Sequence, residues 1–398
     1  MTANTSDPIV IVNGSRTPMG GFQGALSDVG APALGACSIV GALEKSGVKP
    51  ADIEEVIMGC VLPAGLGQAP ARQASIGASI PLSTHCTTIN KMCGSGMKAV
   101  MLAHDLLTAG SVNTMVAGGL ESMSNAPYLL PKVRDGLRMG HGEVKDHMFT
   151  DGLEDVFEPG RLMGSFAEQT ATRYQFTREA QDAFAITSLE RANKAISDCT
   201  FAKEITPVTF NTRQGEVTVS SDEQPPKANI ERIPTLRPAF EKDGTVTAAN
   251  SSSISDGAAA VVMMRQSEAE KRGLRPVARI LAHSSHAHEP AWFTTAPVSA
   301  IEKLLKKLDK NANDIDLYEI NEAFAVVTMA AMQDLGLDHE KVNVHGGACA
   351  LGHPVGASGT RIIITLINAL QKYDLKTGIA SLCIGGGEAT AVAIERIT

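Results

Sequence analysis

The strongest constraint on the fold is a pattern that occurs twice: a Gly-rich turn, a helix, and a short apolar strand that ends in glycines. The first copy starts at Cys93 and its strand ends at Gly118-Gly119, and the second starts at Gly356 and ends at Gly385-Gly386. We interpret the repeat as an internal duplication, with chance similarity of two strand–helix–strand units as the alternative. Two like halves would face their reactive residues toward each other.

The first third of the chain alternates short apolar runs with segments of helical periodicity, which predicts an α/β fold with a parallel sheet. The expected strands are 9–12, 55–58, 87–90 and 114–117, and the expected helices are 32–46 and 97–107. Residues 122–249 carry many charges and prolines, with a helix expected at 178–195 and an irregular stretch at 203–242. We interpret this middle part as an insertion that caps the core.

Composition excludes several classes of protein. The 398 residues predict two or three domains, and the net charge of −8 without basic clusters argues against a nucleic-acid partner. No apolar run is long enough to span a membrane. The seven cysteines include no CxxC pair, which argues against disulfides and zinc ribbons. We expect a cytoplasmic protein, although a processed organellar protein would look the same.

Cys93 is the strongest candidate for chemistry because it lies where an expected strand ends and a helix begins. The positive end of that helix predicts a lowered thiol pKa and a nucleophilic thiolate. Gly94 and Gly96 are expected to let a substrate carbonyl approach the backbone. The alternative is a structural cysteine in a Gly-rich turn.

Three further segments carry reactive side chains. His353 lies among glycines and would act as a base toward a thiol. Cys383 precedes three glycines whose N–H groups would hold an oxyanion, and the Asn321 amide would orient a water or bind an enolate oxygen.

These segments together resemble the thiolase family over essentially the whole chain. The motifs are Asn90–Gly96, Asn321–Ala325, Gly346–Gly359 and Cys383–Gly387, in that order. The resemblance implies a five-layered αβαβα fold with two similar βαβ-containing halves and an inserted loop domain that binds coenzyme A. The implied domains are an N-terminal half at 1–121 to which 250–275 return, the loop domain at 122–249, and a C-terminal half at 276–398.

The resemblance also implies roles. Cys93 carries the acyl group and His353 deprotonates it, while Cys383 takes the Cα proton of the second acyl-CoA and returns it in cleavage. Asn321, through a water, and His353 hold the enolate oxygen. The N–H groups of Cys93 and Gly385 hold the thioester oxyanion.

The resemblance also implies contacts to coenzyme A: Ser252 matches the family position that contacts the pantetheine arm, and Ala248 lies near it. Lys227 is a candidate for a phosphate contact, with a merely solvated side chain as the alternative. Coenzyme A is substrate and product here, and no resident cofactor is expected.

The acyl pocket is expected to include Leu162 and Met163, where many short-chain members have His-Met-Gly. Leu162 departs from that pattern, and Met163 predicts a pocket closed at short chain length. Phe293 and Phe324 would narrow the pocket further, with core packing as the alternative for both.

The histidines at 283, 286 and 288 have the spacing of metal ligands. We expect them in a loop without acidic neighbours, and therefore predict no metal site. No GxGxxG motif opens a helix after a strand, which argues against a dinucleotide.

The leading functional hypothesis is an acetyl-CoA C-acetyltransferase activity, the reversible condensation of two acetyl-CoA to acetoacetyl-CoA and coenzyme A through an acetyl-cysteine. The alternatives are a broader 3-ketoacyl-CoA thiolase of fatty-acid degradation and, from another class, a noncatalytic acyl-CoA-binding scaffold. A β-ketoacyl synthase would pair its cysteine with two histidines, whereas His353 is joined here by Cys383 and Asn321. The resemblance implies a homotetramer, with a dimer as the alternative.

Overall fold

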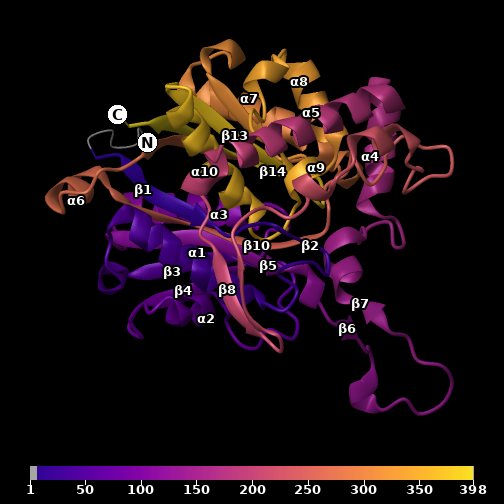
Figure 1. The fold of residues 1–398 in the computed structure, drawn as a ribbon, viewed down its shortest axis with the longest axis horizontal. Coiled ribbons are helices and arrows are strands. Elements are labelled where there is room, and N and C mark those ends of the chain that lie inside the picture. Colours follow the sequence, from indigo (N-terminus) through magenta and orange to yellow (C-terminus); the bar gives the residue numbers. More distant parts are fainter. Residues whose placement is uncertain (1–6, 398) are drawn as a thin grey trace.

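The computed structural model describes residues 7–397 (Figure 1). Residues 1–6 and 398, the outer ends of the two predicted halves, lie outside the described part. Within that part, no helix combines the length and the apolar character needed to cross a membrane. Its strands form one large sheet and two short hairpins, and its helices cover the sheet.

The N-terminal half of the sheet has the order β4-β3-β5-β10-β1. Its strands are β1 (Ile9–Arg16), β3 (Glu55–Gly59), β4 (His85–Ile89), β5 (Thr114–Ser122) and β10 (Ser255–Arg265). The first three strands in this order are parallel, and β10 and β1 are antiparallel additions. The strands expected at 9–12, 55–58, 87–90 and 114–117 are therefore confirmed, with longer β1 and β5. Strand β10 returns to this half after a long excursion of the chain, and the domain boundaries at 122 and 249 stay predictions.

The C-terminal half repeats this pairing in the order β12-β13-β14-β11. Its strands are β11 (Ala278–Ala287), β12 (Leu317–Ile320), β13 (Thr377–Ile384) and β14 (Glu388–Arg396). A parallel pair is again followed by two antiparallel strands. Short pairing of β1 with β11 joins the two halves. The same order of parallel and antiparallel pairing in both halves is what an internal duplication produces.

Two helices form the layer between the halves of the sheet. They are α3 (Ser95–Ala109) and α10 (Ser358–Lys372), the helices of the two repeated motifs. Their apolar side chains share one buried cluster with side chains from both halves of the sheet, including Ile11 and Leu382. The central layer is therefore a single core that excludes water on all sides.

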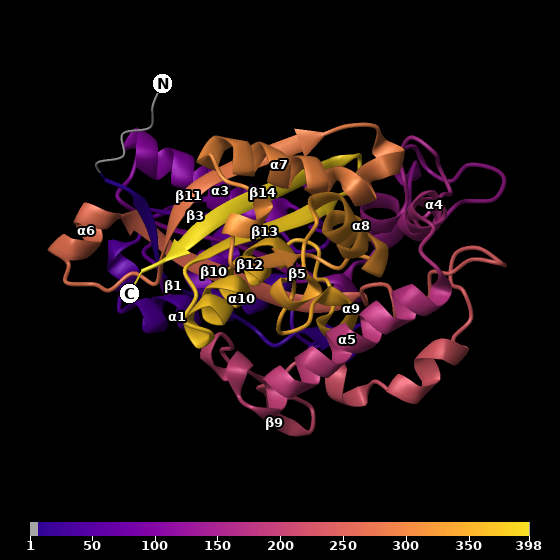
Figure 2. The same cartoon turned by 90° about the horizontal axis from the view of Figure 1, so that it is seen from above.

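Helices on the two outer faces complete five layers (Figures 1 and 2). Helices α1 (Ala31–Ser46) and α2 (Pro70–Gly77) cover the N-terminal half with a second apolar cluster. Helices α7 (Ala296–Leu308) and α8 (Ala325–Leu335) cover the C-terminal half with a third. The αβαβα fold expected from the sequence is confirmed.

Glycines in the repeated motifs allow the two central helices to meet. A Cβ on Gly359 would lie 2.3 Å from the backbone nitrogen of Met97, and one on Gly96 would lie 2.9 Å from Thr360. A Cβ on Gly94 would meet Ile384 at 2.4 Å. The expectation that Gly94 and Gly96 make room for a substrate carbonyl was wrong, because protein atoms occupy that room.

The excursion between β5 and β10 forms helices and a hairpin beside the sheet (Figure 2). Its main elements are α4 (Met163–Tyr174), α5 (Arg178–Ser197), β8 (Val208–Thr212) and β9 (Gly215–Val219). The β8–β9 hairpin lies in the stretch expected to be irregular, and it is ordered because Val208 packs into the α1 cluster. The excursion also contains the short strands β6 (Tyr128–Leu129) and β7 (Lys145–Asp146). Short elements elsewhere in the chain are β2 (Gly20–Gly21), α6 (Gln266–Lys271) and α9 (Ala348–Leu351).

The expectation of three histidines in a loop without acidic neighbours was wrong. His283 and His286 lie on β11, and His288 follows directly after it. The Nε2 of His283 lies 2.9 Å from the Oδ1 of Asp105 on α3. Tertiary packing brings this carboxylate to a histidine 178 residues away in sequence.

Candidate active site

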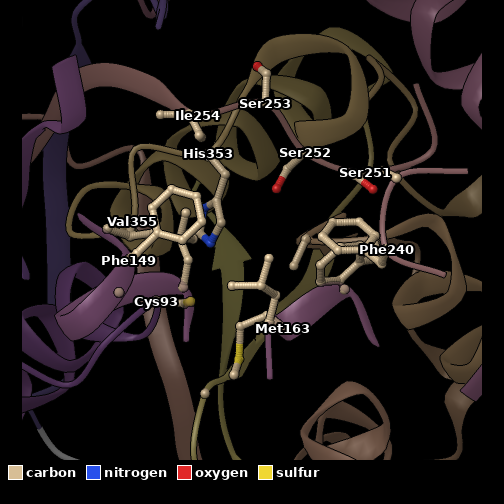
Figure 3. Close-up of a pocket in the computed structure, with 18 of the residues that line it drawn as sticks. Cys93, Phe149, Met163, Phe240, Ser251, Ser252, Ser253, Ile254, His353 and Val355 are labelled. Atoms are coloured by element: carbon tan, nitrogen blue, oxygen red, sulfur yellow. The ribbon is translucent and has the colours of Figure 1, made fainter. Parts of the chain in front are cut away.

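One cavity of about 360 Å³ brings the two halves and the excursion together. Cys93 comes from the N-terminal half, Met163 and Phe240 from the excursion, and His353 and Gly385 from the C-terminal half. Figure 3 shows Cys93 and His353 at one end of this cavity, with the imidazole turned into it. The two halves therefore place the candidate nucleophile and the candidate base against one space.

Cys93 lies in the turn between β4 and α3, preceded by Met92 with φ of +47°. Positive φ at a residue other than glycine is strained, and such strain is typical of sharp turns that present a nucleophile. Cys93 as a residue is partly exposed and lines the cavity. The backbone N–H groups of Gly385 and of Cys93 itself act on the thiol as hydrogen-bond donors.

The thiol is nevertheless less acidic than an ordinary cysteine. Burial raises the pKa of Cys93 to about 11, because the thiolate loses hydration, and the two N–H donors offset this only in part. The expectation of a lowered pKa from the helix end was therefore wrong for the substrate-free protein. A neutral thiol needs a base that removes its proton as it attacks.

His353 has the geometry of such a base. Its Nδ1 lies 2.5 Å from the Ser358 Oγ, and that hydroxyl donates to the carbonyl oxygen of Pro354 at 3.0 Å. Because the Ser358 hydroxyl donates its proton to Pro354, its oxygen accepts a hydrogen bond from the Nδ1–H of His353. Nε2 is then the unprotonated nitrogen, and it has no hydrogen-bond partner in the described part of the chain. Burial lowers the pKa of His353 to about 3, with a further contribution from Arg361, so the imidazole is neutral.

Cys383 and Asn321 lie buried next to the cavity and are not part of its lining. Cys383 is the next-to-last residue of β13 and packs among Phe293 and Phe324. Burial, with the nearby Cys93, raises its pKa well above the ordinary value. Asn321 follows β12, and neither atom of its amide has a hydrogen-bond partner within residues 7–397. A buried amide without partners is costly unless it binds water or substrate, so Asn321 is suited to hold an oxygen atom.

Six of the expected substrate contacts line the cavity: Leu162, Met163, Ala248, Ser252, Phe293 and Phe324. Gly385, the expected oxyanion donor, lines it too. Lys227 does not: its ammonium pairs with the Glu223 carboxylate at 2.5 Å, away from the cavity. The apolar wall is consistent with an acyl and pantetheine site.

Several wall residues were missed by sequence reasoning. Phe240 packs edge-to-face on Phe324 with ring centroids 5.9 Å apart, and it fills the space over Gly164. Phe149 reaches the same cavity from a turn far away in sequence. The two phenylalanines stand in segments without periodicity, so the sequence holds no signal for them. Val355, two residues after His353, could have been found from its motif.

Comparison with known proteins agrees with this geometry. The N-terminal thiolase domain family matches residues 9–267, and the C-terminal thiolase domain family matches residues 274–396. The acetyl-CoA acetyltransferase of Thiocystis violacea is 48% identical, over 98% of this chain and 100% of that protein. The enzyme of the same name from Schizosaccharomyces pombe is 46% identical, over 98% and 99%.

Two solved structures share the fold. The acetyl-CoA acetyltransferase of Bacillus anthracis superposes with a TM-score of 0.96 at 40% identity, covering 98% of this chain and 99% of that one. The Acat5 thiolase of Ascaris suum, solved in complex with coenzyme A, gives 0.92 at 42% identity, covering 98% and 100%. Both family domains and the full-length relatives lead to one conclusion: this chain belongs to the thiolase family.

Proposed function

We propose that this protein is an acetyl-CoA acetyltransferase that condenses two acetyl-CoA to acetoacetyl-CoA and coenzyme A, and catalyses the reverse cleavage. The observation that carries the proposal is that Cys93 and His353 line one end of the same apolar cavity (Figure 3), with a His353 Nε2 that has no hydrogen-bond partner within residues 7–397. The full-length relatives from Thiocystis violacea and Schizosaccharomyces pombe have this activity in their names. The relative from Ascaris suum binds coenzyme A.

In the first half-reaction the Cys93 sulfur attacks the carbonyl carbon of acetyl-CoA. His353 Nε2 takes the thiol proton as the new S–C bond forms, because a free thiolate is disfavoured in this buried site. The N–H groups of Cys93 and Gly385 stabilise the oxyanion, and each such donor contributes roughly 3–4 kcal/mol of barrier lowering. The C–S bond to coenzyme A then breaks, and the thiol of Cys383 gives its proton to the leaving sulfur.

In the second half-reaction the Cys383 thiolate takes a proton from the methyl carbon of another acetyl-CoA. Its raised pKa suits this step, because a more basic thiolate removes a carbon-bound proton more readily. Asn321, through a water, and His353 stabilise the enolate oxygen. The carbanion attacks acetyl-Cys93, and the Cys93 sulfur leaves and recovers its proton from His353. No resident cofactor enters either half-reaction.

The residues that line the acyl end of the cavity favour substrates with a short acyl chain. Met163 lies close to Gly385, with its sulfur 3.5 Å from the position of a Cβ there, and Phe293 and Phe324 close the buried side. Coenzyme A-dependent cleavage of acetoacetyl-CoA and of a medium-chain 3-ketoacyl-CoA measures this directly. A higher kcat/KM for acetoacetyl-CoA supports the proposal. Equal or faster cleavage of the longer substrate would instead assign a broader 3-ketoacyl-CoA thiolase.

Covalent catalysis is tested by peptide mass spectrometry after brief mixing with acetyl-CoA. We expect an acetyl group on Cys93 in the natural protein and none at this peptide in Cys93→Ala. Coenzyme A binding without turnover on every acyl-CoA tested would favour a noncatalytic scaffold.

We also propose a homotetramer. A segment beside the β6–β7 hairpin exposes large apolar side chains, which isolated chains rarely leave in water. The most exposed are Met139, Val156, Tyr128, Phe157 and Leu137. Light scattering after size-exclusion chromatography distinguishes four copies from two, and Met139→Glu should shift a tetramer to dimers.

The proposed compartment is the cytoplasm. All seven cysteines are free thiols, which is usual in a reducing compartment. Cell fractionation with an antibody against the protein tests this, and enrichment in an organelle would contradict it.

A further inference from the structure

Three side chains with metal-binding atoms meet outside the catalytic cavity, between α3 and β11. His104 and Asp105 are neighbours on α3, and His283 lies on β11. The Asp105 Oδ1 lies 3.3 Å from the His104 Nδ1 and 2.9 Å from the His283 Nε2. All three atoms lie within 4.8 Å of one another. One ion could therefore contact all three.

The donor set is that of a transition-metal ion. Imidazole nitrogens and a carboxylate oxygen suit Zn²⁺, Co²⁺ and Ni²⁺, whereas Mg²⁺ and Ca²⁺ prefer oxygen ligands alone. Zinc binds such atoms at about 2.0–2.2 Å in a tetrahedron, which places neighbouring ligands a little over 3 Å apart. The observed separations of 2.9 and 3.3 Å are close to that ligand–ligand distance. Small side-chain rotations therefore bring all three ligand atoms to one ion, with water as the fourth ligand.

Burial and charge at this cluster also suit an ion. Both imidazoles are largely buried, with 21% and 18% of their side-chain surface exposed, whereas Asp105 exposes 54% and leaves an entrance for metal and water ligands. The ammonium of Lys307 is a positive charge that opposes the binding of a cation, and it donates a hydrogen bond to the His283 carbonyl oxygen at 2.7 Å.

We propose that His104, Asp105 and His283 form a binding site for a divalent transition-metal ion, such as Zn²⁺ or Co²⁺. The ion joins the N-terminal half to the C-terminal half, because α3 and β11 belong to different halves. It also fixes helix α3, which begins two residues after the nucleophile Cys93. The site lies apart from the cavity lining, so its role is to hold the scaffold and not to react with substrate.

Titration of the intact protein with Co²⁺, followed by visible absorption, tests the site. Nitrogen and oxygen ligands give ligand-field bands alone, whereas cysteine ligands add a sulfur-to-cobalt charge-transfer band. The test variants are His283→Gln and Asp105→Asn. His286→Gln is the matched control, because it removes a histidine from the same strand that has no partner at either ring nitrogen within the described residues.

We expect ligand-field bands without charge transfer, and a Tm that rises with Co²⁺ or Zn²⁺. Both effects should persist in His286→Gln, and the apparent Kd should rise roughly tenfold or more in His283→Gln and Asp105→Asn, since each loses a ligand. A charge-transfer band, an unchanged Kd in both test variants, or no bands at a large excess of Co²⁺ would overturn the proposal. Acetoacetyl-CoA cleavage by the metal-free variants checks that they remain folded.

Discussion

Replacing Ser358 with alanine tests how the fold sets the protonation of His353, the proposed base. Ser358 touches His353 and the Pro354 carbonyl, and it is not part of the cavity lining. In Ser358→Ala the Nδ1–H of His353 loses its acceptor inside the protein. The ring then either keeps an unpaired N–H or moves its proton to Nε2, where it blocks acceptance of the Cys93 proton.

The size of the effect follows from the burial of that pair. An unpaired buried donor costs about 1–3 kcal/mol. If the loss falls on the transition state, kcat/KM falls roughly 5- to 150-fold, since about 1.4 kcal/mol is a factor of ten. KM should change little, because Ser358 is not in contact with the space that substrate fills.

The assay is coenzyme A-dependent cleavage of acetoacetyl-CoA, with kcat and KM measured separately. The pH dependence of Cys93 alkylation by iodoacetamide gives a second readout, because alkylation requires the thiolate. Thr365→Val is the matched control: it removes a buried hydroxyl from the same helix, and that hydroxyl bonds Glu204 instead. A kcat/KM within twofold of the natural protein, or an equal loss in Thr365→Val, would refute the reasoning.

Three further perturbations probe the acid/base, the buried charges and the buried histidine. Cys383→Ala should still become acetylated on Cys93. The rate at which the methyl group of acetyl-CoA exchanges its protons for deuterium in D₂O should fall roughly 10²- to 10⁴-fold, as expected for a lost general base. An exchange rate near that of the natural protein would contradict the role of Cys383. Arg16→Met should reduce the free energy of unfolding by about 3–5 kcal/mol in urea titrations, because the buried carboxylates of Glu204 and Asp222, which Arg16 contacts at 2.7 and 2.6 Å, lose the guanidinium that pairs with both. Burial lowers the pKa of His345 to about 4, so the unfolded chain binds more protons than the native protein between about pH 4 and 6.5. Stability should therefore fall as pH falls through this window, and His345→Phe should weaken the dependence in thermal melts at several pH values. An unchanged dependence in that variant would assign the acid sensitivity to other groups.

The sequence by itself determined the architecture and predicted the candidate reactive residues. Helical and strand periodicity report which face of a segment is apolar, and that information is local. The repeated turn–helix–strand pattern therefore predicted two halves, and the resemblance to the thiolase family implied the five layers that the structure confirms. The four motifs also predicted that Cys93 and His353 take part in chemistry. Packing alone seldom places such reactive side chains beside glycines at the ends of strands.

Only the tertiary structure decided the environment of those residues. The helix end beside Cys93 predicted an acidic thiol, but burial by residues far away in sequence removes hydration and raises its pKa. Gly96 serves the crossing of α3 and α10, which no local pattern reveals. Phe240 and the meeting of His283 with Asp105 likewise depend on segments that the chain brings together only on folding. Desolvation and long-range contacts depend on the whole packed molecule, and a linear pattern does not encode them residue by residue.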